Sequence, residues 1–342
     1  MEKLFLVTNP GSSSRKYALY KNGQEVCSLH FETEDKKLIC TLKHSDGRTQ
    51  KFTNGFKRIA DTIRYTYNIL TETGYLSVDD TLDGILARVV ATGEFFNNDY
   101  IVDDECLRLL EEEKRRAPLH VPVIAAEISK CVETFPETPV IIISDSHFHH
   151  TRDEVHKLYA IDVDLANRAE IKRYGYHGLS MGAVRNYLRD HDLLPERVVA
   201  CHLGSGASLT AIKGGYSYDT TMGYTPLEGV MMATRSGDID PAAAIAIQRA
   251  IGEMVASMCG TDALVFTATI GERNAEIRRD IVAGLEYLGF KLDDQKNDAG
   301  LGDSDYIDIS AKGSKPIYVI HTDEAAAMLR RAEILLTAQE TK

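Results

Sequence analysis

The sequence predicts an α/β protein made of two similar halves. Short β-prone apolar runs alternate with segments of helical periodicity along the chain. A strand–loop–strand hairpin with small residues in its loop occurs near the start and again in the middle. The length of 342 residues also fits two domains. We therefore expect two facing α/β halves, each of which offers one hairpin loop to a shared central cleft.

The first half reads as strands and helices in alternation. The pair Asn22-Gly23, a strong hairpin signal, follows a β-prone run, and Pro118 stops a charged amphipathic helix. The expected elements are strands at residues 3–8, 17–20, 85–90 and 140–143, a turn-rich loop at 9–14, and helices at 56–73 and 103–116.

The second half begins with the repeated hairpin. Residues 291–310 are polar and rich in Gly and Asp, which predicts an irregular surface connection. The other expected elements are strands at 198–201, 209–212, 263–267 and 316–320, loops at 202–208 and 268–272, a helix through 277–288, and a last helix at 324–339.

The composition argues against several classes of function. Because 51 acidic residues outnumber 39 basic ones, the net charge is −12, which disfavours a nucleic-acid partner but not a small anionic substrate. The six cysteines form no Cys-x-x-Cys pair, which is typical of free thiols in a reducing cytoplasm. The apolar start is too short for a signal peptide, and no apolar run approaches the ~18 residues of a membrane span. We expect a cytoplasmic protein with no membrane partner.

Both hairpin loops have the composition of an anion pocket. Hydroxyls and backbone N–H groups beside glycine can approach phosphate oxygens closely, because no side chain intervenes. Gly11-Ser12-Ser13-Ser14 with Lys16 fits this use, and so does the loop at 202–208. A Ser-rich turn is usually only a turn, so the useful observation is that two such loops each follow a buried strand.

Four further residues indicate cationic groups arranged around an anion. Arg88 lies within an apolar strand, where a charge needs a partner or a ligand. Asp145 ends a second buried strand, a common place for functional side chains in α/β folds. His177 and Arg235, the latter in a tract that mixes apolar and ionic residues, complete the set. The alternative interpretation is a structural Arg–Asp pair.

A histidine cluster offers a different hypothesis. His147, His149, His150 and His156 are closely spaced, and imidazoles two apart on a strand share a face and could ligate zinc. No metalloprotease-type motif frames them, so a structural or solvated role is the favoured interpretation.

Ordered segments along nearly the whole chain resemble the acetate kinase (acetokinase) family. The most specific are Arg173-Tyr174-Gly175-Tyr176-His177-Gly178 and the tract that ends at Pro241. The matching segments are residues 9–16, 87–94, 144–149, 173–178, 219–241, 266–272 and 322–324.

This resemblance implies the duplicated actin-like, sugar-kinase (ribonuclease H-like) fold, usually as a homodimer. The first domain would span residues 1–150 and the second 151–324, and the helix at 325–342 would pack back onto the first domain. The activity implied is Mg²⁺-dependent phosphoryl exchange between ATP and a short-chain carboxylate, which gives an acyl phosphate.

The resemblance also implies residue roles. Asn9 and Glu324 would serve the metal, Arg88 would bind the carboxylate, and Asp145, His177 and Arg235 would act in catalysis. Residues expected to hold the nucleotide and its phosphates are Ser12, Lys16, His202, Leu203, Gly204, Ser205, Gly206, Thr269, Ile270, Gly271, Glu272 and Arg273. Cationic groups and Mg²⁺ suit phosphoryl transfer, which depends on positioning and charge neutralisation.

The chain also departs from the family pattern. The family usually has His where this chain has Ala87 and Ala91, Gly where it has Thr92, and Asn where it has Ser205. In the loop that normally approaches adenosine, Ala268 and Thr269 replace glycines and Arg273 replaces Asn. The segment that normally helps to clasp the base and ribose is missing after Pro241. Two alternatives therefore stay open: pyrophosphate as the phosphoryl donor, or a catalytically weak binding or regulatory protein.

Overall fold

The computed structural model describes residues 3–11, 14–34, 37–53, 55–77, 80–114, 121–232 and 243–340. The chain divides into two compact units. The first comprises Met1–Ala91, Asn98–Ser144 and Ala325–Lys342, and the second comprises Thr92–Asn97 and Asp145–Glu324.

The first unit is built on a sheet of strand order β5-β4-β3-β2-β1-β6-β8-β7. Strands β1 to β5 form an antiparallel meander, whereas β1, β6 and β8 are parallel. The strands are β1 Leu4–Pro10, β2 Ser14–Lys21, β3 Gln24–Glu34, β4 Lys37–His44, β5 Thr49–Phe52, β6 Gly84–Val89, β7 Tyr100–Ile101 and β8 Val140–Ser144.

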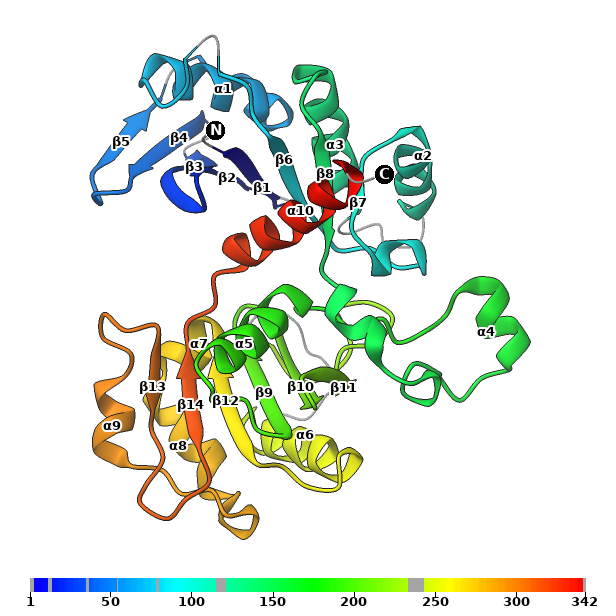
Figure 1. The fold of residues 1–342 in the computed structure, drawn as a ribbon, viewed down its shortest axis with the longest axis vertical. Helices are drawn as coiled ribbons and strands as arrows, with labels where there is room; N and C mark the ends of the chain where they lie inside the picture. The colour runs from blue at the N-terminus through cyan, green and yellow to red at the C-terminus, as the bar shows by residue number, and fades with distance from the viewer. Residues whose placement is uncertain are drawn as a thin grey trace. The chain divides into compact units, whose positions relative to one another are not determined.

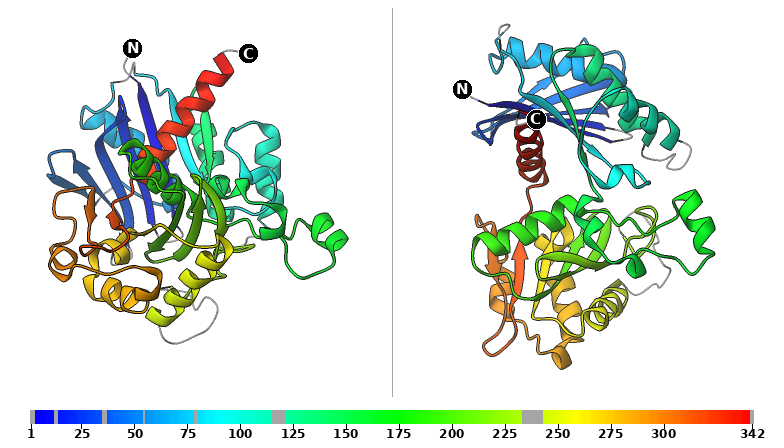
Figure 2. Two further views of the ribbon diagram at one scale, coloured as in Figure 1. Left: turned by 60° about the horizontal axis from the view of Figure 1, so that its bottom comes forward. Right: turned by 45° about the vertical axis from the view of Figure 1, so that its right-hand side comes forward.

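Helices cover both faces of this sheet. Figure 2 shows α1 and α3 on one face and α10 on the other, so the central strands β6 and β8 are buried and read as nearly continuous apolar runs. Arg331 of α10 donates hydrogen bonds to the side chain of Asp99 and, at 2.9 Å, to the carbonyl of Ser144. The helices are η1 Ile59–Asp61, α1 Thr62–Glu72, α2 Asp104–Glu113, α3 Val121–Thr134 and α10 Glu324–Glu340.

The second unit has a sheet of order β11-β10-β9-β12-β14-β13, in which β9, β12 and β14 are parallel (Figure 1). Met181, Val184 and Leu188 of α5 pack in one core with Val198 and Val265 of the sheet. The strands are β9 Arg197–Leu203, β10 Ala207–Lys213, β11 Tyr216–Thr220, β12 Ala263–Thr267, β13 Tyr306–Asp308 and β14 Ile317–Ile320. The helices are η2 Phe95–Asn97, η3 His147–Thr151, η4 Glu154–His156, α4 Val163–Ala169, α5 Gly178–Asp190, α6 Ala243–Ser257, α7 Ala268–Arg273, α8 Ala275–Ala283, η5 Glu286–Leu288 and α9 Asp294–Ala299.

The predicted hairpin repeat is confirmed. Both β1–β2 and β9–β10 are antiparallel pairs, and in each the first strand also pairs in parallel with a later strand. Several local expectations are wrong. Residues 268–272 form helix α7 rather than a loop, and the stretch 291–310 contains α9 and β13. The helix expected through 277–288 ends at Ala283, and 286–288 form the separate helix η5. Within the described residues, no helix combines the length and the apolar character needed to cross a bilayer.

Candidate active site

Asp145 lies at the N-terminal end of helix α5. It directly follows β8 and is 1% exposed. Its Oδ2 accepts a hydrogen bond from the backbone N–H of His177 at 2.9 Å, and its carbonyl oxygen accepts one from the N–H of Gly178 at 2.8 Å. Because the N–H groups at a helix N-terminus stabilise negative charge, the fold holds a buried carboxylate at the start of α5.

Backbone geometry fixes the two residues that meet Asp145. His177 is the N-cap of α5 and has a φ of 60°, a left-handed conformation that is uncommon outside glycine and tends to occur at functional sites. A Cβ on Gly178 would lie 2.4 Å from the Asp145 carbonyl oxygen, so only glycine fits. The His-Gly order of the sequence motif therefore has a steric reason.

His177 and His202 form a stacked pair. Their ring centroids are 4.0 Å apart, and the ring planes differ by 24°. Nδ1 of His177 lies 2.9 Å from Ser208 Oγ, and Nδ1 of His202 lies 2.9 Å from Ser180 Oγ. Both imidazoles are buried. Each Nδ1 therefore has a serine hydroxyl as its partner, which fixes the orientation of both rings.

A row of hydroxyls continues from this pair. Ser180 Oγ lies 3.3 Å from Thr322 Oγ1, which in turn lies 3.2 Å from Thr267 Oγ1. Thr267 ends β12 and Thr322 follows β14, so these hydroxyls gather at the carboxyl edge of parallel strands, where α/β proteins bind ligands. None of these three residues was predicted to have a role, because an isolated hydroxyl is too common a signal.

The second hairpin loop lies against the start of α7. The Gly204 N–H donates to the Gly206 carbonyl at 3.0 Å, which closes the turn. A Cβ on Gly204 would lie 3.4 Å from the Cβ of Ala268. His202 and Leu203, expected in the loop, belong to β9 instead. The predicted phosphate loop and the predicted nucleotide segment are therefore neighbours.

Helix α7 has an unusual start and a buried anchor. Ala268 has a φ of 64°, the left-handed conformation that favours glycine, so the backbone is strained at the start of this helix. The buried Arg278 of α8 donates to the carbonyl oxygens of Gly271 and Glu272, each at 2.8 Å, which satisfies groups that a helix end leaves unpaired. Nothing in the sequence pattern singled out Arg278.

A pocket of about 510 Å³ adjoins α7. Glu272 and Arg273, which were predicted to bind the nucleotide, line this pocket together with His321 and residues 297–305. Glu272 Oε2 lies 3.0 Å from His321 Nδ1. A pocket of this volume is large enough for a nucleoside, and its carboxylates can accept hydrogen bonds from hydroxyl and amino groups.

The predicted site residues of the first unit lie on neighbouring strands. Asn9 and Lys16 are opposite each other in the β1–β2 pair, and both are exposed. Arg88 is half-buried in β6, opposite Ile143 of β8. Because β6 runs parallel to both β1 and β8, Arg88 lies toward the carboxyl end of these strands.

Other predicted residues are placed less fully. Ser12 and Arg235 lie outside the described residues, so the expected convergence of Arg88 and Arg235 on one anion stays a prediction. Glu324 is the first residue of α10 and is half-buried. Ser205 is exposed at the tip of the second hairpin. Thr269 and Ile270 lie in α7.

The histidine cluster makes structural contacts. His149 is fully buried, with Nδ1 2.8 Å from Ser217 Oγ and Nε2 2.9 Å from the Tyr176 carbonyl oxygen. His147 Nδ1 lies 3.0 Å from the Asn97 carbonyl oxygen. In the part of the chain that the structure describes, no group of three or more His, Cys, Asp or Glu side chains is arranged to hold a metal ion. The zinc hypothesis therefore has no support among these residues.

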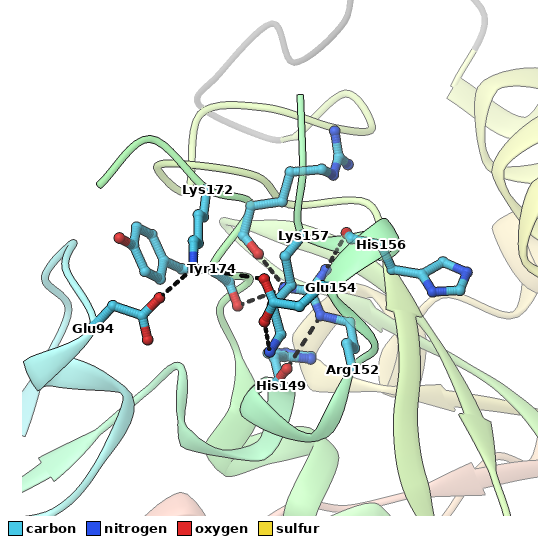
Figure 3. Close-up of polar contacts among 9 residues, drawn as sticks. Glu94, His149, Arg152, Glu154, His156, Lys157, Lys172 and Tyr174 are labelled. Atoms are coloured by element: carbon cyan, nitrogen blue, oxygen red, sulfur yellow. Dashed lines mark hydrogen bonds and ion pairs between the residues drawn. The ribbon is translucent and has the colours of Figure 1, made fainter. Parts of the chain in front are cut away.

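Arg152 ties this cluster to the segment that leads to His177 (Figure 3). Its guanidinium is buried and donates to the carbonyl oxygens of His149 at 3.2 Å, His156 at 3.3 Å and Tyr174 at 2.9 Å. These bonds join η3 and η4 to the chain that precedes α5. The arrangement makes Arg152 and His149 supports of the site rather than ligands of a metal.

Burial lowers the pKa of His149 to about 3, and the Arg152 cation acts in the same direction. In the unfolded chain the imidazole has a pKa of ~6.5. Between about pH 3 and about pH 6.5, the unfolded state therefore binds a proton that the folded state does not bind. This contribution to stability is complete above about pH 6.5 and falls by about 1.4 kcal/mol per pH unit toward about pH 3.

We therefore expect His149→Gln to weaken the pH dependence of folding. Between about pH 7.5 and pH 5, the wild type would lose about 2 kcal/mol more unfolding free energy than the variant. Urea denaturation at both pH values measures this difference. Equal losses in the two proteins would contradict a neutral, buried His149.

Comparison with solved structures identifies the architecture. A Porphyromonas gingivalis acetate kinase superposes with a TM-score of 0.86 at 25% identity, covering 98% of this chain and 100% of that chain. A propionate kinase from Francisella tularensis gives a TM-score of 0.85 at 29% identity, covering 96% and 98%. The predicted duplicated actin-like fold is thus confirmed, and the protein falls in the class of carboxylate phosphotransferases with that fold.

Sequence comparison gives the family. The model described as the Acetokinase family matches residues 4–249 and 244–330. The acetate kinase of Shouchella clausii is 32% identical over 400 residues, covering 99% of this chain and 100% of the relative. That of Clostridium botulinum is 31% identical over 395 residues, covering 95% and 97%. The chain belongs to the acetokinase family.

The chain is shorter than these relatives. The alignment with the Shouchella clausii protein is 400 residues long, whereas this chain has 342 residues. The Shouchella clausii protein therefore has residues at positions that this chain lacks. The two pieces of the family match meet at residues 244–249, close to Pro241, after which the sequence predicts a missing segment.

Proposed function

We propose that this protein is a Mg²⁺-dependent acetate kinase-type phosphotransferase. It would move a phosphoryl group reversibly between ATP and acetate, or another short-chain carboxylate, giving acyl phosphate and ADP. The observation that carries the proposal is the buried Asp145 carboxylate at the start of α5, next to the stacked pair His177 and His202. We also propose a homodimer in the cytoplasm, as the family resemblance implies.

The second unit would handle the transferred group. The imidazoles of His177 and His202, which stack on each other, would donate hydrogen bonds to the phosphoryl oxygens. The backbone around Gly204 would approach the donor's phosphates without side-chain obstruction. Asp145 would keep its charge at the helix N-terminus and orient the groups that meet there.

The first unit would bind the acceptor. A carboxylate is already ionised at pH 7, so the reaction needs no strong base. It needs cations that let two anions approach, and Arg88 would bind the carboxylate while Lys16 neutralises the donor's phosphates. Arg235 would join them at the phosphoryl group.

Asn9 and Glu324 would hold Mg²⁺. An amide oxygen and a carboxylate are the hard oxygen donors that this ion takes, usually together with phosphate and water. Bound there, the ion would supply neutralisation of phosphate charge. Chelation of Mg²⁺ is therefore expected to abolish turnover.

The donor is proposed to be ATP, because the pocket lined by Glu272 and Arg273 has room for a nucleoside. Pyrophosphate remains the second candidate, because the chain is shorter than its relatives and the strained Ala268 alters the segment next to this pocket.

A paired-acceptor assay tests both candidates. The purified protein would be mixed with Mg²⁺ and acetyl phosphate, with either ADP or orthophosphate as acceptor. We expect ATP to form from ADP, and pyrophosphate formation from orthophosphate would instead assign the second donor class. Failure of transfer to either acceptor, across several short acyl phosphates, would favour a binding protein on the same scaffold.

A further inference from the structure

The β1–β2 hairpin presents different chemistry on its two faces. Asn9 and Lys16 form a cross-strand pair, and both are exposed. Successive side chains of a strand point to opposite faces, so Thr8, Arg15 and Tyr17 share the other face. These three are buried. The hairpin therefore exposes its proposed ligand-binding groups on one face and is anchored through the other.

Arg15 bonds to both ends of the turn in this hairpin. Its Nη1 donates to the carbonyl oxygen of Gly11 and, at 3.1 Å, to that of Ser14. The Gly11 N–H also donates to the Ser14 carbonyl at 3.0 Å. A single guanidinium thus fixes the distance between the residues at which the chain leaves β1 and enters β2.

The guanidinium is itself held by a buried acid from helix α3. Arg15 Nε lies 3.4 Å from Oε2 of Glu127, and the two side chains are 7% and 1% exposed. Oε1 of Glu127 accepts hydrogen bonds from Tyr17 Oη at 2.6 Å and Thr8 Oγ1 at 3.3 Å. All of these donors belong to β1 or β2, so the single carboxylate of Glu127 connects α3 to both strands of the hairpin.

Burying the ion pair of Arg15 and Glu127 costs free energy, so its position beneath the hairpin calls for an explanation other than stability. Two charges removed from water are stabilised by each other only if their remaining hydrogen-bonding groups are also satisfied, and apolar residues would often give equal stability. Burial raises the pKa of Glu127, while the Tyr17 hydroxyl and the Arg15 cation oppose that rise. A stability role alone does not explain why an arginine reaches the two turn carbonyls.

We propose that Arg15 and Glu127 are positioning residues that hold the adjoining ends of β1 and β2, at Gly11 and Ser14, in place for the phosphoryl donor. This inference rests on the proposed function, in which Asn9 and Lys16 on the opposite face meet the metal and the phosphates. The ion pair fixes the backbone at Gly11 and Ser14, and so sets the spacing of those two side chains before the donor binds.

The test separates the effect of Arg15 on the turn carbonyls of Gly11 and Ser14 from its effect on the stability of the buried group around Glu127. Arg15→Leu with Glu127→Gln removes both charges, while the glutamine oxygen still accepts from Tyr17 and Thr8, so this double variant is expected to fold. Tyr17→Phe is the matched control, because it removes a bond to Glu127 and leaves the turn contacts of Arg15 in place. Arg15→Lys keeps a cation but lacks the guanidinium, which reaches from Glu127 at Nε to the two carbonyls at Nη1.

Hydrogen exchange at the Gly11 amide is the first readout. In the double variant and in Arg15→Lys it is expected to be about tenfold faster or more than in the wild type, while Tyr17→Phe keeps the wild-type rate. Unchanged exchange in the double variant would overturn the inference, whether or not the protein is a kinase.

Steady-state kinetics with acetyl phosphate and ADP are the second readout. The double variant is expected to lose about 10- to 100-fold in kcat/KM for ADP, with little change in KM for acetyl phosphate. An equal loss in Tyr17→Phe would assign the cluster a purely structural role. Absence of turnover in the wild type would refute the proposed function instead. The exchange result would still show whether Arg15 and Glu127 hold the backbone at Gly11.

Discussion

Changing Asp145 to asparagine is expected to lower kcat by about 10²- to 10³-fold while the melting temperature changes little. The asparagine oxygen can still accept the His177 N–H that Oδ2 accepts at 2.9 Å, so the start of α5 is preserved. The negative charge at the centre of the site is lost. Steady-state rates and a thermal melt of the same preparation measure the two effects separately.

Asp162→Asn is the matched control for this change. Asp162 also caps a helix, accepting from the Leu165 N–H at 2.8 Å, but that helix, α4, carries none of the proposed site residues. It is expected to keep wild-type kcat. If Asp145→Asn also keeps it, Asp145 is only a helix cap and the proposed chemistry is wrong.

The second large effect is expected at Arg88. Arg88→Met would lower kcat/KM for acetate by about 10- to 100-fold, mainly through KM, because hydrogen bonds between charged groups contribute about 1.5–3 kcal/mol. Methionine retains most of the apolar stem in β6, which limits damage to the fold. Initial rates over a range of acetate concentrations at saturating ATP test this expectation.

Arg64→Met provides the comparison, since Arg64 is a largely exposed arginine of α1 that lies 3.9 Å from Glu133. It is expected to change neither KM nor kcat. A loss of stability in Arg88→Met with an unaltered KM for acetate would make Arg88 a structural cation and remove the proposed acceptor site.

The parts of the fold that follow from short-range pattern were predictable. The two hairpins were found because each joins apolar runs through a loop of small residues, and both are antiparallel pairs in the structure. Asp145 and His177 were singled out from a strand end and a motif. Their direct contact through the His177 N–H joins segments far apart in the chain, which no local pattern reveals.

The failures of prediction have physical causes. Residues 268–272 were expected to be a loop, but the buried Arg278 satisfies the carbonyls at the end of a short helix there. The pairing of Arg15 with Glu127 depends on which face of β2 meets α3, and strand periodicity does not fix that. In both cases the structure depends on a charged residue and a partner distant in the sequence, which a local sequence pattern does not reveal.

Trapping of the acyl phosphate tests the central claim most directly, because only a carboxylate acceptor yields a product that reacts with hydroxylamine. The wild type would be incubated with acetate, ATP, Mg²⁺ and hydroxylamine, and acetohydroxamate would be measured. We predict hydroxamate that requires acetate, nucleotide and Mg²⁺ together and is nearly absent with Asp145→Asn. No hydroxamate with either ATP or pyrophosphate as donor, for acetate or propionate, would contradict the account.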